Sequence, residues 1–404
     1  MNPQDVEGLE DETVTLWSQA EDALIGALSA AALAVSVRAR SPEHARQVAA
    51  EELARTIRPQ SVAVARVLQQ STPALVEAAV SEAAGIGVAA AHAEVAALPV
   101  GVTAAPAAPT VAPAAASTAA APQPAMVLPE TRPQIPGSAA ARGAASKAAE
   151  ATTTSLGKAA RNIPRNTQTV WGKIIDNAVN KTVTGDLTIQ QALQQAMDDA
   201  AKQGIGFYRD SAGRKWGLDT YSEMAIRTGT NNALVDAHTA ELVEVGMDLV
   251  IVSSHANPAP QCAPYERRVL SLTGEHQAGT HRIDGHNVTV KDTLNGARAH
   301  GFEHPGCRHT VTAFLPGFTD TTTPVADPDH VGYKATQKQR YYEREIRKSR
   351  RMGQAAIDED GRKNAEARRR QYEAKLREHI REYDLPRRRH REKLRQPGNP
   401  MPVA

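Results

Sequence analysis

The chain has 404 residues, of which only 4% are aromatic, which is few for one large apolar core. Its 47 Lys and Arg nearly balance its 45 Asp and Glu, for a formal net charge of +2. Two cysteines in such a length exclude a disulfide scaffold of the kind that small secreted proteins use. The acidic N-terminus argues against a secretory signal, so we expect a protein made in a reducing cytoplasm.

The charges are distributed unevenly along the chain. Between Lys334 and Arg395, 22 Lys and Arg stand against 11 Asp and Glu, a local charge of +11. The first 22 residues hold seven acidic side chains and no basic one. This asymmetry predicts a basic end that meets a polyanion and an acidic remainder that faces other protein.

Residues 1–98 are predicted to form an acidic segment of alanine-rich helices. Apolar side chains recur at three- and four-residue spacing, and Ser41-Pro42-Glu43 is typical of a helix start. The longest uncharged apolar stretch without proline, Ala23 to Val37, has 15 residues, which is shorter than the ~18–20 that span a bilayer. We therefore expect no membrane partner. Because alanine buries little area, these helices need partners, either within the chain or in another copy of it.

Residues 99–155 are predicted to form a linker. From Pro99 to Ala125, 18 of 27 residues are Ala or Pro, a composition that blocks regular structure and offers little to bury. A Gly, Ser and Ala-rich stretch continues it to about Ser155. The chain then reads as helical again, with one apolar stripe over residues 189–200 and a longer helix from about Leu218 to Gly246.

From residue 248 on, the apolar residues no longer recur at helical spacing but form short runs typical of strands. This change indicates a small α+β module up to residue 315. Strands are predicted at residues 249–252, 268–272 and 310–314. Residues 281–288 contain the Asp-Gly dipeptide of a tight hairpin, and Asp292 is the expected cap of a short helix that runs to His300.

Histidine and cysteine cluster in this module. Seven of the 13 histidines and both cysteines lie between His255 and His309. Neutral imidazole and thiolate are the ligands that zinc prefers, so one hypothesis is a structural zinc site. Its ligands would be Cys262, His304, Cys307 and His309. Two alternatives stay open: a catalytic site, and a turn at His304-Pro305-Gly306 whose polar neighbours bond to the backbone.

Four motifs follow one another here in an order that resembles a known family. They are Val252-Ser253-Ser254-His255, Pro260-Gln261-Cys262-Ala263-Pro264-Tyr265, Val269-Leu270-Ser271-Leu272-Thr273-Gly274 and His304-Pro305-Gly306-Cys307-Arg308-His309. Together they resemble the minor capsid (head morphogenesis) proteins of tailed bacteriophages, which are related more loosely to the phage Mu F-like head proteins. The resemblance covers about Gln168 to Leu394 and leaves residues 1–155 outside. The family often has histidine at the position of Cys262, an exchange that suits a metal ligand and equally suits a buried polar turn.

The resemblance implies a non-enzymatic, low-copy protein of the capsid interior, assembled in the host cytoplasm. Such proteins associate with the portal and other capsid proteins and act in genome packaging or delivery. Residues 156–320 would then be the minor capsid (Mu F-like) module. The alternative is a metal-dependent nuclease or other effector enzyme that uses the window from residue 255 to 309, with His281, His286, His300, His304 and His309 as its histidines.

Residues 321–404 are predicted to form a basic helical tail with a disordered end. Its arginines group in two triplets, and Pro386 is expected to end the helix between them. Inside a capsid these arginines would contact packaged double-stranded DNA without sequence preference. The alternatives are an acidic protein surface and a solvated face paired with glutamates. The triplets are Arg368, Arg369, Arg370 and Arg387, Arg388, Arg389.

The expected fold class is therefore α+β and predominantly helical. Alanine-rich N-terminal helices would precede a disordered Ala/Pro linker, a helical module with a small β part, and a long basic C-terminal helix. The N-terminal helices are also candidates for self-association.

Overall fold

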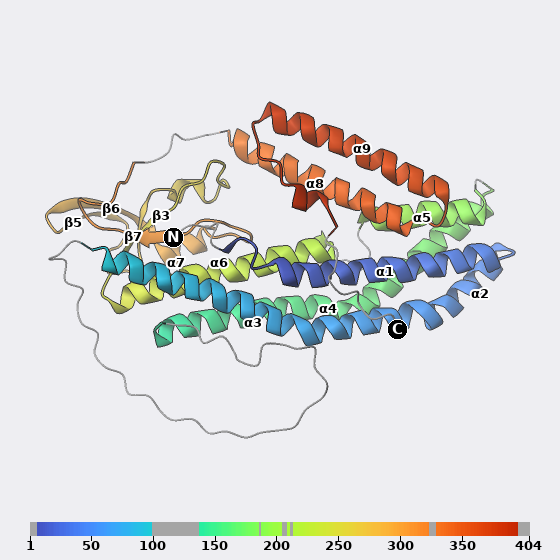
Figure 1. Ribbon diagram of the computed structural model, residues 1–404, viewed down its shortest axis with the longest axis horizontal. Coiled ribbons are helices and arrows are strands. Elements are labelled where there is room, and N and C mark those ends of the chain that lie inside the picture. The colour runs from blue at the N-terminus through green and yellow to red at the C-terminus, as the bar shows by residue number, and fades with distance from the viewer. Residues whose placement is uncertain are drawn as a thin grey trace, which may run out of the picture. The chain divides into compact units, whose positions relative to one another are not determined.

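A computed structural model confirms the predicted α+β class, because the chain is mostly helical and carries small sheets (Figure 1). The structure describes residues 6–98, 137–185, 187–203, 208–210, 213–322 and 329–394. The predicted linker thus lies outside the described residues from residue 99 to residue 136.

Residue contacts divide the chain into two compact units. Unit 1 consists of Met1–Leu9, Ala74–Thr152 and Arg227–Ala326. Unit 2 consists of Glu10–Pro73, Thr153–Ile226 and Asp327–Ala404. Each unit therefore combines three separate stretches, whereas the segments expected from composition follow one another along the chain. Three helices contribute residues to both units: α3 (Arg58–Ala96), α4 (Ala139–Val183) and α6 (Leu218–Glu244).

Unit 1 contains a five-stranded sheet of order β5-β6-β4-β3-β7, in which only β4 and β6 pair in parallel. The predicted strands and hairpin are confirmed. Asp284 and Gly285 connect β5 to β6 with positive φ angles of 47° and 80°, as a tight hairpin turn requires. The elements are β3 (Leu249–Val252), η3 (Ala263–Tyr265), β4 (Val269–Ser271), β5 (Gly279–Ile283), β6 (His286–Thr293), α7 (Leu294–Ala299) and β7 (Val311–Ala313).

The central strand β3 is buried on both of its faces. Val250 and Val252 pack in one apolar cluster with Leu270, while residues 249 and 251 pack in a second cluster on the other side. Successive side chains of a strand point to opposite faces, so a continuous apolar run is what a doubly covered strand needs. The first cluster also holds both cysteines, Cys262 and Cys307.

Small residues let the helices of unit 1 approach closely. A Cβ added at Gly87 of α3 would lie 2.2 Å from the backbone oxygen of Leu234 of α6, and one at Gly229 would lie 2.2 Å from Thr152 Oγ1 of α4. A larger side chain at residue 87 would force the two helix backbones apart, and one at residue 229 would displace the Thr152 side chain. The alanine- and glycine-rich composition therefore serves close helix packing.

Two local expectations need correction. Helix α4 begins at Ala139, so residues 139–155 are helical and not linker. Alanine has the highest helix propensity, and Ala141 and Ala145 bury their side chains almost completely, which a linker would not do. The cap of α7 is Thr293 and not Asp292, because the Thr293 hydroxyl accepts the Gly296 amide hydrogen.

Unit 2 is built mainly from helices. Ser41 caps α2 as predicted, since its side chain accepts the His44 amide hydrogen. The basic tail forms two helices and not one long helix, and they run side by side in opposite directions (Figure 1). The second ends at Glu382, before Pro386. The elements are α1 (Asp11–Arg38), α2 (Pro42–Glu52), the π-turn η2 (Leu53–Ile57), α5 (Ile189–Gln203), β1 (Tyr208–Arg209), β2 (Lys215–Trp216), α8 (Val331–Ala355), α9 (Glu359–Glu382) and η4 (Arg389–Glu392).

A buried ion cluster joins α1, α6 and α8 within unit 2. One guanidinium nitrogen of Arg351 lies 2.8 Å from Asp219 Oδ2 and 3.3 Å from Glu21 Oε2. Arg347 adds a second cation, 3.3 Å from the same Asp219 oxygen. The basic tail is therefore anchored to the acidic N-terminal helix of its own chain, and these charges are not available to a partner.

The pKa values in this cluster are strongly shifted. Burial raises the pKa of Glu21 to about 7 against the opposing effect of Arg351, and it raises that of Asp22 to about 6. Burial would also raise the pKa of Asp219, but Arg351 and Arg347 outweigh it and hold that pKa well below its usual range. Asp219 is therefore the ionised partner of Arg351.

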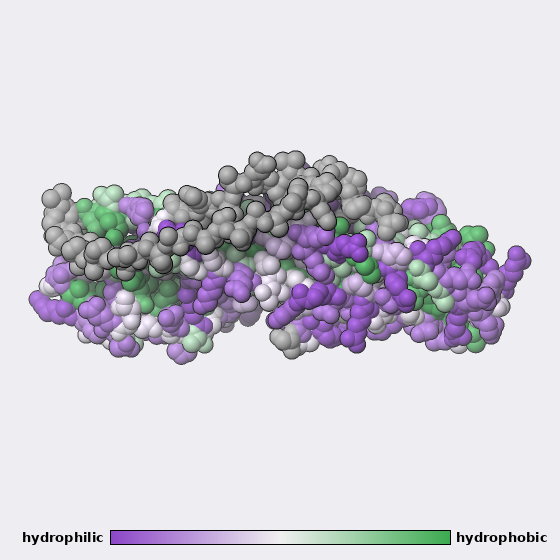
Figure 2. All heavy atoms as spheres, turned by 90° about the horizontal axis from the view of Figure 1, so that it is seen from below, coloured by the Kyte–Doolittle hydropathy of each residue, from purple (hydrophilic) through white to green (hydrophobic). Residues whose placement is uncertain are grey.

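By length and composition, α1 and the helical stretch Pro42–Ala96 could each cross a membrane, although 44% and 50% of their most apolar windows are buried in the protein. The apolar side chains of α1 pack against α2, α5 and α8, and Trp17, Leu24 and Leu28 are fully buried. Figure 2 shows hydrophilic residues over much of the coloured surface of one face, with smaller hydrophobic groups between them.

Candidate functional site

Three of the four predicted metal ligands come together in unit 1. Cys262 directly precedes η3, while Cys307 and His309 lie between α7 and β7. The Cys262 and Cys307 sulfurs are 3.7 Å apart, and His309 Nδ1 lies 3.3 Å from Cys307 Sγ. All three ligand atoms lie within 4.8 Å of one another. The arrangement brings two sulfurs and one imidazole nitrogen to a single buried point.

His304 is the fourth residue of the predicted set, and the structure places it outside this group. It starts the predicted turn, in which the Cys307 amide donates to the His304 carbonyl over 2.8 Å. Its half-buried imidazole contacts the Pro305 carbonyl through Nδ1 at 3.0 Å. His304 thus positions Cys307 through its backbone.

The Glu266 carboxylate orients the His309 ring from the other side. Glu266 Oε1 lies 3.1 Å from His309 Nε2, and both side chains are about 95% buried or more. Burial would lower the pKa of His309, but the contacts with Cys307 and Glu266 outweigh it and raise that pKa to about 9. The ring is therefore held between a sulfur and a carboxylate.

The two thiols are coupled to each other. The contact with Cys307 lowers the pKa of Cys262 against the opposing effect of burial, and the backbone of Glu303 and His304 lowers that pKa further. The same sulfur–sulfur contact, together with burial, raises the pKa of Cys307 well above its usual range. Cys262 is thus the more acidic thiol, and its thiolate character is supported by backbone amides.

His255 belongs to the same cluster, although the sequence pattern did not assign it to the metal set. Its ring packs edge-to-face on that of His309, with centroids 4.4 Å apart. Its Nε2 is buried and has no hydrogen-bond partner among the described residues. Burial and the neighbouring His309 lower the pKa of His255, which keeps it neutral. A neutral imidazole whose nitrogen has no hydrogen-bond partner among the described residues can act as a metal ligand.

The other histidines of the window do not join this cluster. His300 contacts Asp292, His281 contacts the Gln277 carbonyl, and His286 is exposed. His276 meets Asp248, whose pKa falls to about 2 because hydrogen bonds from Thr273, His276 and Ser271 outweigh burial. These contacts tie His276, His281 and His300 to separate groups, and among the described residues the five histidines of the alternative enzyme site are not gathered at one point.

The predicted DNA-binding arginines divide into paired and exposed ones. Arg368 bonds to Glu345 at 2.7 Å, Arg369 bonds to Glu373 at 3.0 Å, and Arg387 grips Glu392 with two hydrogen bonds. These three stabilise the fold of the tail. Of the other three, Arg370 is 67% exposed, Arg389 is exposed and Arg388 is half-buried.

The structure shows a further set of basic residues on α9, which is not evident from the arginine triplets in the sequence and shares Arg370 with them. Four exposed cations lie at positions 363, 370, 377 and 381 of α9, spaced by seven, seven and four residues. At 3.6 residues per turn these positions fall on one face of the helix, with exposed alanines between them. We call Lys363, Arg370, Arg377 and Arg381 the basic stripe.

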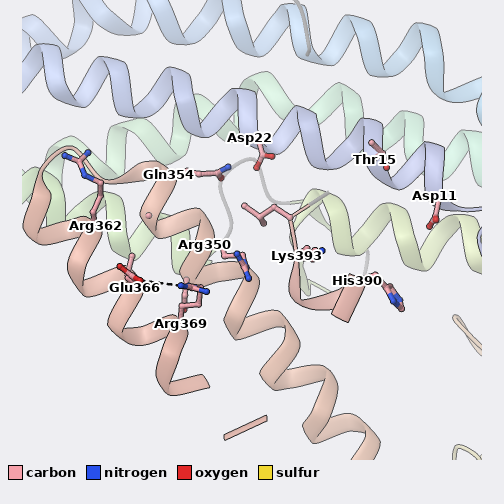
Figure 3. Close-up of a pocket in the computed structure, with 14 residues that line it drawn as sticks. Asp11, Thr15, Asp22, Arg350, Gln354, Arg362, Glu366, Arg369, His390 and Lys393 are labelled. Atoms are coloured by element: carbon pink, nitrogen blue, oxygen red, sulfur yellow. Dashed lines mark hydrogen bonds and ion pairs between the residues drawn. The ribbon is translucent and has the colours of Figure 1, made fainter. Parts of the chain in front are cut away.

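A cleft of about 1090 Å³ lies elsewhere in unit 2, beside the inner side of the tail (Figure 3). Asp11 and Asp22 of α1 face basic residues of α8, α9 and the segment around η4. Acidic and basic side chains nearly balance in its lining, and Glu366 pairs with Arg369 there. The lining of the cleft therefore has only one more basic than acidic side chain, too little surplus to attract a polyanion.

Comparison with known proteins identifies the family. The family model described as "Phage minor capsid protein 2" matches residues 1–381. A protein named "Structural protein" of Lactococcus phage LL-H is 30% identical over 223 residues, which are 54% of this chain and 59% of that relative. The chain thus spans less than two thirds of the length of this relative. No solved structure matches the chain.

The family match corrects one expectation from the motifs and confirms another. It begins at residue 1, so the N-terminal helices belong to the resemblance, which the motifs alone placed only from about Gln168 onward. The predicted phage minor capsid family is confirmed by the match over nearly the whole chain. The chain belongs to the phage minor capsid protein 2 family.

Proposed function

We propose that this protein is a low-copy minor capsid protein that lies in the head interior near the portal. There it contacts packaged DNA, without sequence preference, during head assembly or genome delivery. Family membership supports the capsid role, and the basic stripe of α9 is the one structural observation that carries the DNA contact.

The stripe has the geometry that duplex DNA needs. Its four cations run from residue 363 to residue 381 of one helix, a rise of about 27 Å at about 1.5 Å per residue. Duplex DNA presents one negative charge per about 1.7 Å of its axis, so one row of cations meets several phosphates. The row lacks the aromatic and amide side chains that read bases, so the contact is sequence-independent.

The cations of the basic stripe are not part of the ion pairs that hold unit 2 together. Arg351, Arg368 and Arg387 each meet a carboxylate of their own unit, whereas the stripe residues point into solvent. The ion pairs nearest to the stripe are weak, because Lys363–Asp360 is 3.9 Å long and Arg370–Glu366 is 3.7 Å long, all exposed. Phosphates therefore compete easily for these cations.

Replacing the four stripe residues by glutamine is expected to weaken binding of the full chain to duplex DNA. If each cation meets one phosphate, the slope of log Kd against log salt falls by about 3–4, at about 0.9 for each lost contact. Fluorescence anisotropy with a labelled duplex, over a series of salt concentrations, measures both the affinity and this slope.

A matched variant removes the same charge from another exposed helix face of unit 2. Lys158, Arg161, Arg165 and Lys173 of α4 are all exposed, and their replacement by glutamine should leave most of the slope intact. Equal losses in the two quadruple variants would show that net charge and not the stripe binds DNA. No binding by the wild-type chain at low salt would remove the DNA contact altogether.

The capsid location has its own test. In purified phage particles we expect the chain in the head fraction, in far fewer copies than the major capsid protein, and crosslinked to the portal. Quantitative mass spectrometry of separated heads and tails, with crosslinking, measures all three. Recovery of the chain only outside the head would refute the proposed location, whatever the result with DNA.

A further inference from the structure

The geometry points to a zinc site in unit 1, with Cys262, Cys307 and His309 as ligands and His255 as the candidate for the fourth. The site is independent of the DNA contact and of the capsid location. It would tie the loop before η3 to the segment that precedes β7.

The distances between the ligand atoms are those of a zinc tetrahedron. With Zn–S bonds of about 2.3 Å and Zn–N bonds of about 2.0–2.1 Å, tetrahedral angles place two sulfurs about 3.8 Å apart and sulfur about 3.5 Å from nitrogen. The corresponding distances here are 3.7 Å between the sulfurs and 3.3 Å from Cys307 Sγ to His309 Nδ1. Only small adjustments would therefore admit the ion.

The surroundings of the ligands also fit zinc. Glu266 holds the far nitrogen of His309 and fixes the ring in the orientation that presents Nδ1, the carboxylate–histidine pairing common around bound metals. The His309 amide donates to Cys307 Sγ over 3.4 Å. On binding, Zn²⁺ displaces both thiol protons and the Nδ1 proton of His309, whose Nε2 proton stays with Glu266, and two thiolates neutralise the charge of the ion.

His255 completes the set better than His304 does. Its Nε2 is buried without a hydrogen-bond partner among the described residues, an unfavourable state that a bound ion would relieve. Its ring contacts that of His309. His304 by contrast is turned to the Pro305 carbonyl. The structure thus replaces one ligand of the set that sequence spacing suggested.

The test uses the full chain, expressed in medium with zinc, purified with a reductant and without chelator, and then examined by elemental analysis. We expect about one equivalent of zinc per chain in the wild type and a clear loss in Cys307→Ser and His255→Ala. The matched control, His304→Ala, should keep its zinc. Substitution of cobalt into the wild type should add thiolate-to-metal absorption bands, a measurement that does not depend on whether a variant folds.

Three results would overturn the zinc site, and a fourth would overturn the choice of its fourth ligand. Wild-type protein with zinc well below one equivalent, which also fails to take up cobalt, contains no such site. Zinc that survives Cys307→Ser in a folded chain is bound elsewhere. A Cys262–Cys307 disulfide in protein freshly isolated under non-reducing conditions, detected by mass spectrometry, would make the pair a redox element and not a metal site. If zinc is lost in His304→Ala and kept in His255→Ala, the assignment of the fourth ligand is wrong.

Discussion

Replacing Arg351 by alanine is expected to lower the free energy of unfolding of unit 2 by about 3–5 kcal/mol. The substitution leaves Asp219 ionised and Glu21 fully buried without the cation that both face. Three helices distant in sequence meet at this guanidinium, so its loss affects α1, α6 and α8 together. All three tryptophans of the chain lie in unit 2, so tryptophan fluorescence during urea unfolding reports on this unit.

Lys348→Ala on the same helix is the control, because its ion pair with Glu345 lies nearer the surface. We expect a change of no more than about 1 kcal/mol. If the two variants are destabilised equally, the buried cluster has no special role.

The pH dependence of wild-type stability checks the same cluster. Glu21 has a pKa of about 7 in the folded chain and 4.5 without perturbation, so the folded state binds its proton more tightly. Its contribution to stability is therefore greatest in acid and is lost as the pH rises from about 4.5 to about 7. Glu21→Gln should remove this slope, and an unchanged profile in that variant would contradict the assignment.

Local patterns were sufficient to predict the β elements. A four-residue apolar run, an Asp-Gly dipeptide and an alternating stretch each specify a local backbone geometry, and β3, the β5–β6 turn and β7 appear where these patterns lie. Ser41 likewise caps α2 because capping depends only on neighbouring residues. What these predictions share is that each needs no knowledge of distant parts of the chain.

Predictions that depend on distant contacts were less complete. Composition alone cannot distinguish an alanine-rich linker from a helix that buries small side chains, so residues 139–155 were assigned to the linker. The tail was expected to be one helix, whereas a turn at Ala356–Asp358 folds it into two, with Asp358 capping the second. The ion-pair partners of the tail arginines could not be predicted from local patterns either, because Glu21 and Arg351, for example, lie 330 residues apart in sequence.

The candidate site shows the same division. Clustering of histidine and cysteine was sufficient to predict Cys262, Cys307 and His309 as neighbours. His255 was missed as a ligand because its role depends on an unpartnered nitrogen and a ring contact, neither of which leaves a mark in the sequence. The motif Val252-Ser253-Ser254-His255 was the one signal that drew attention to it.

Trp17→Ala is expected to destabilise unit 2 by about 3–5 kcal/mol, because it empties the space of the largest fully buried side chain. The indole packs inside the helical bundle, and its Nε1 donates to Thr72 Oγ1 over 3.1 Å. Urea unfolding followed by circular dichroism, and by the fluorescence of Trp171 and Trp216, measures the loss.

Two further variants separate the packing of the indole from its hydrogen bond. Thr72→Val keeps the volume but leaves the buried N–H without an acceptor, so we expect a loss of about 1–3 kcal/mol. Leu33→Ala on the same helix, at a side chain that is 47% exposed, should cost far less than Trp17→Ala. Because α1 begins within the acidic N-terminal stretch, a small effect of Trp17→Ala would mean that this helix is not part of the core and remains free for partners. A large effect would mean that α1 finds its packing partners within its own chain.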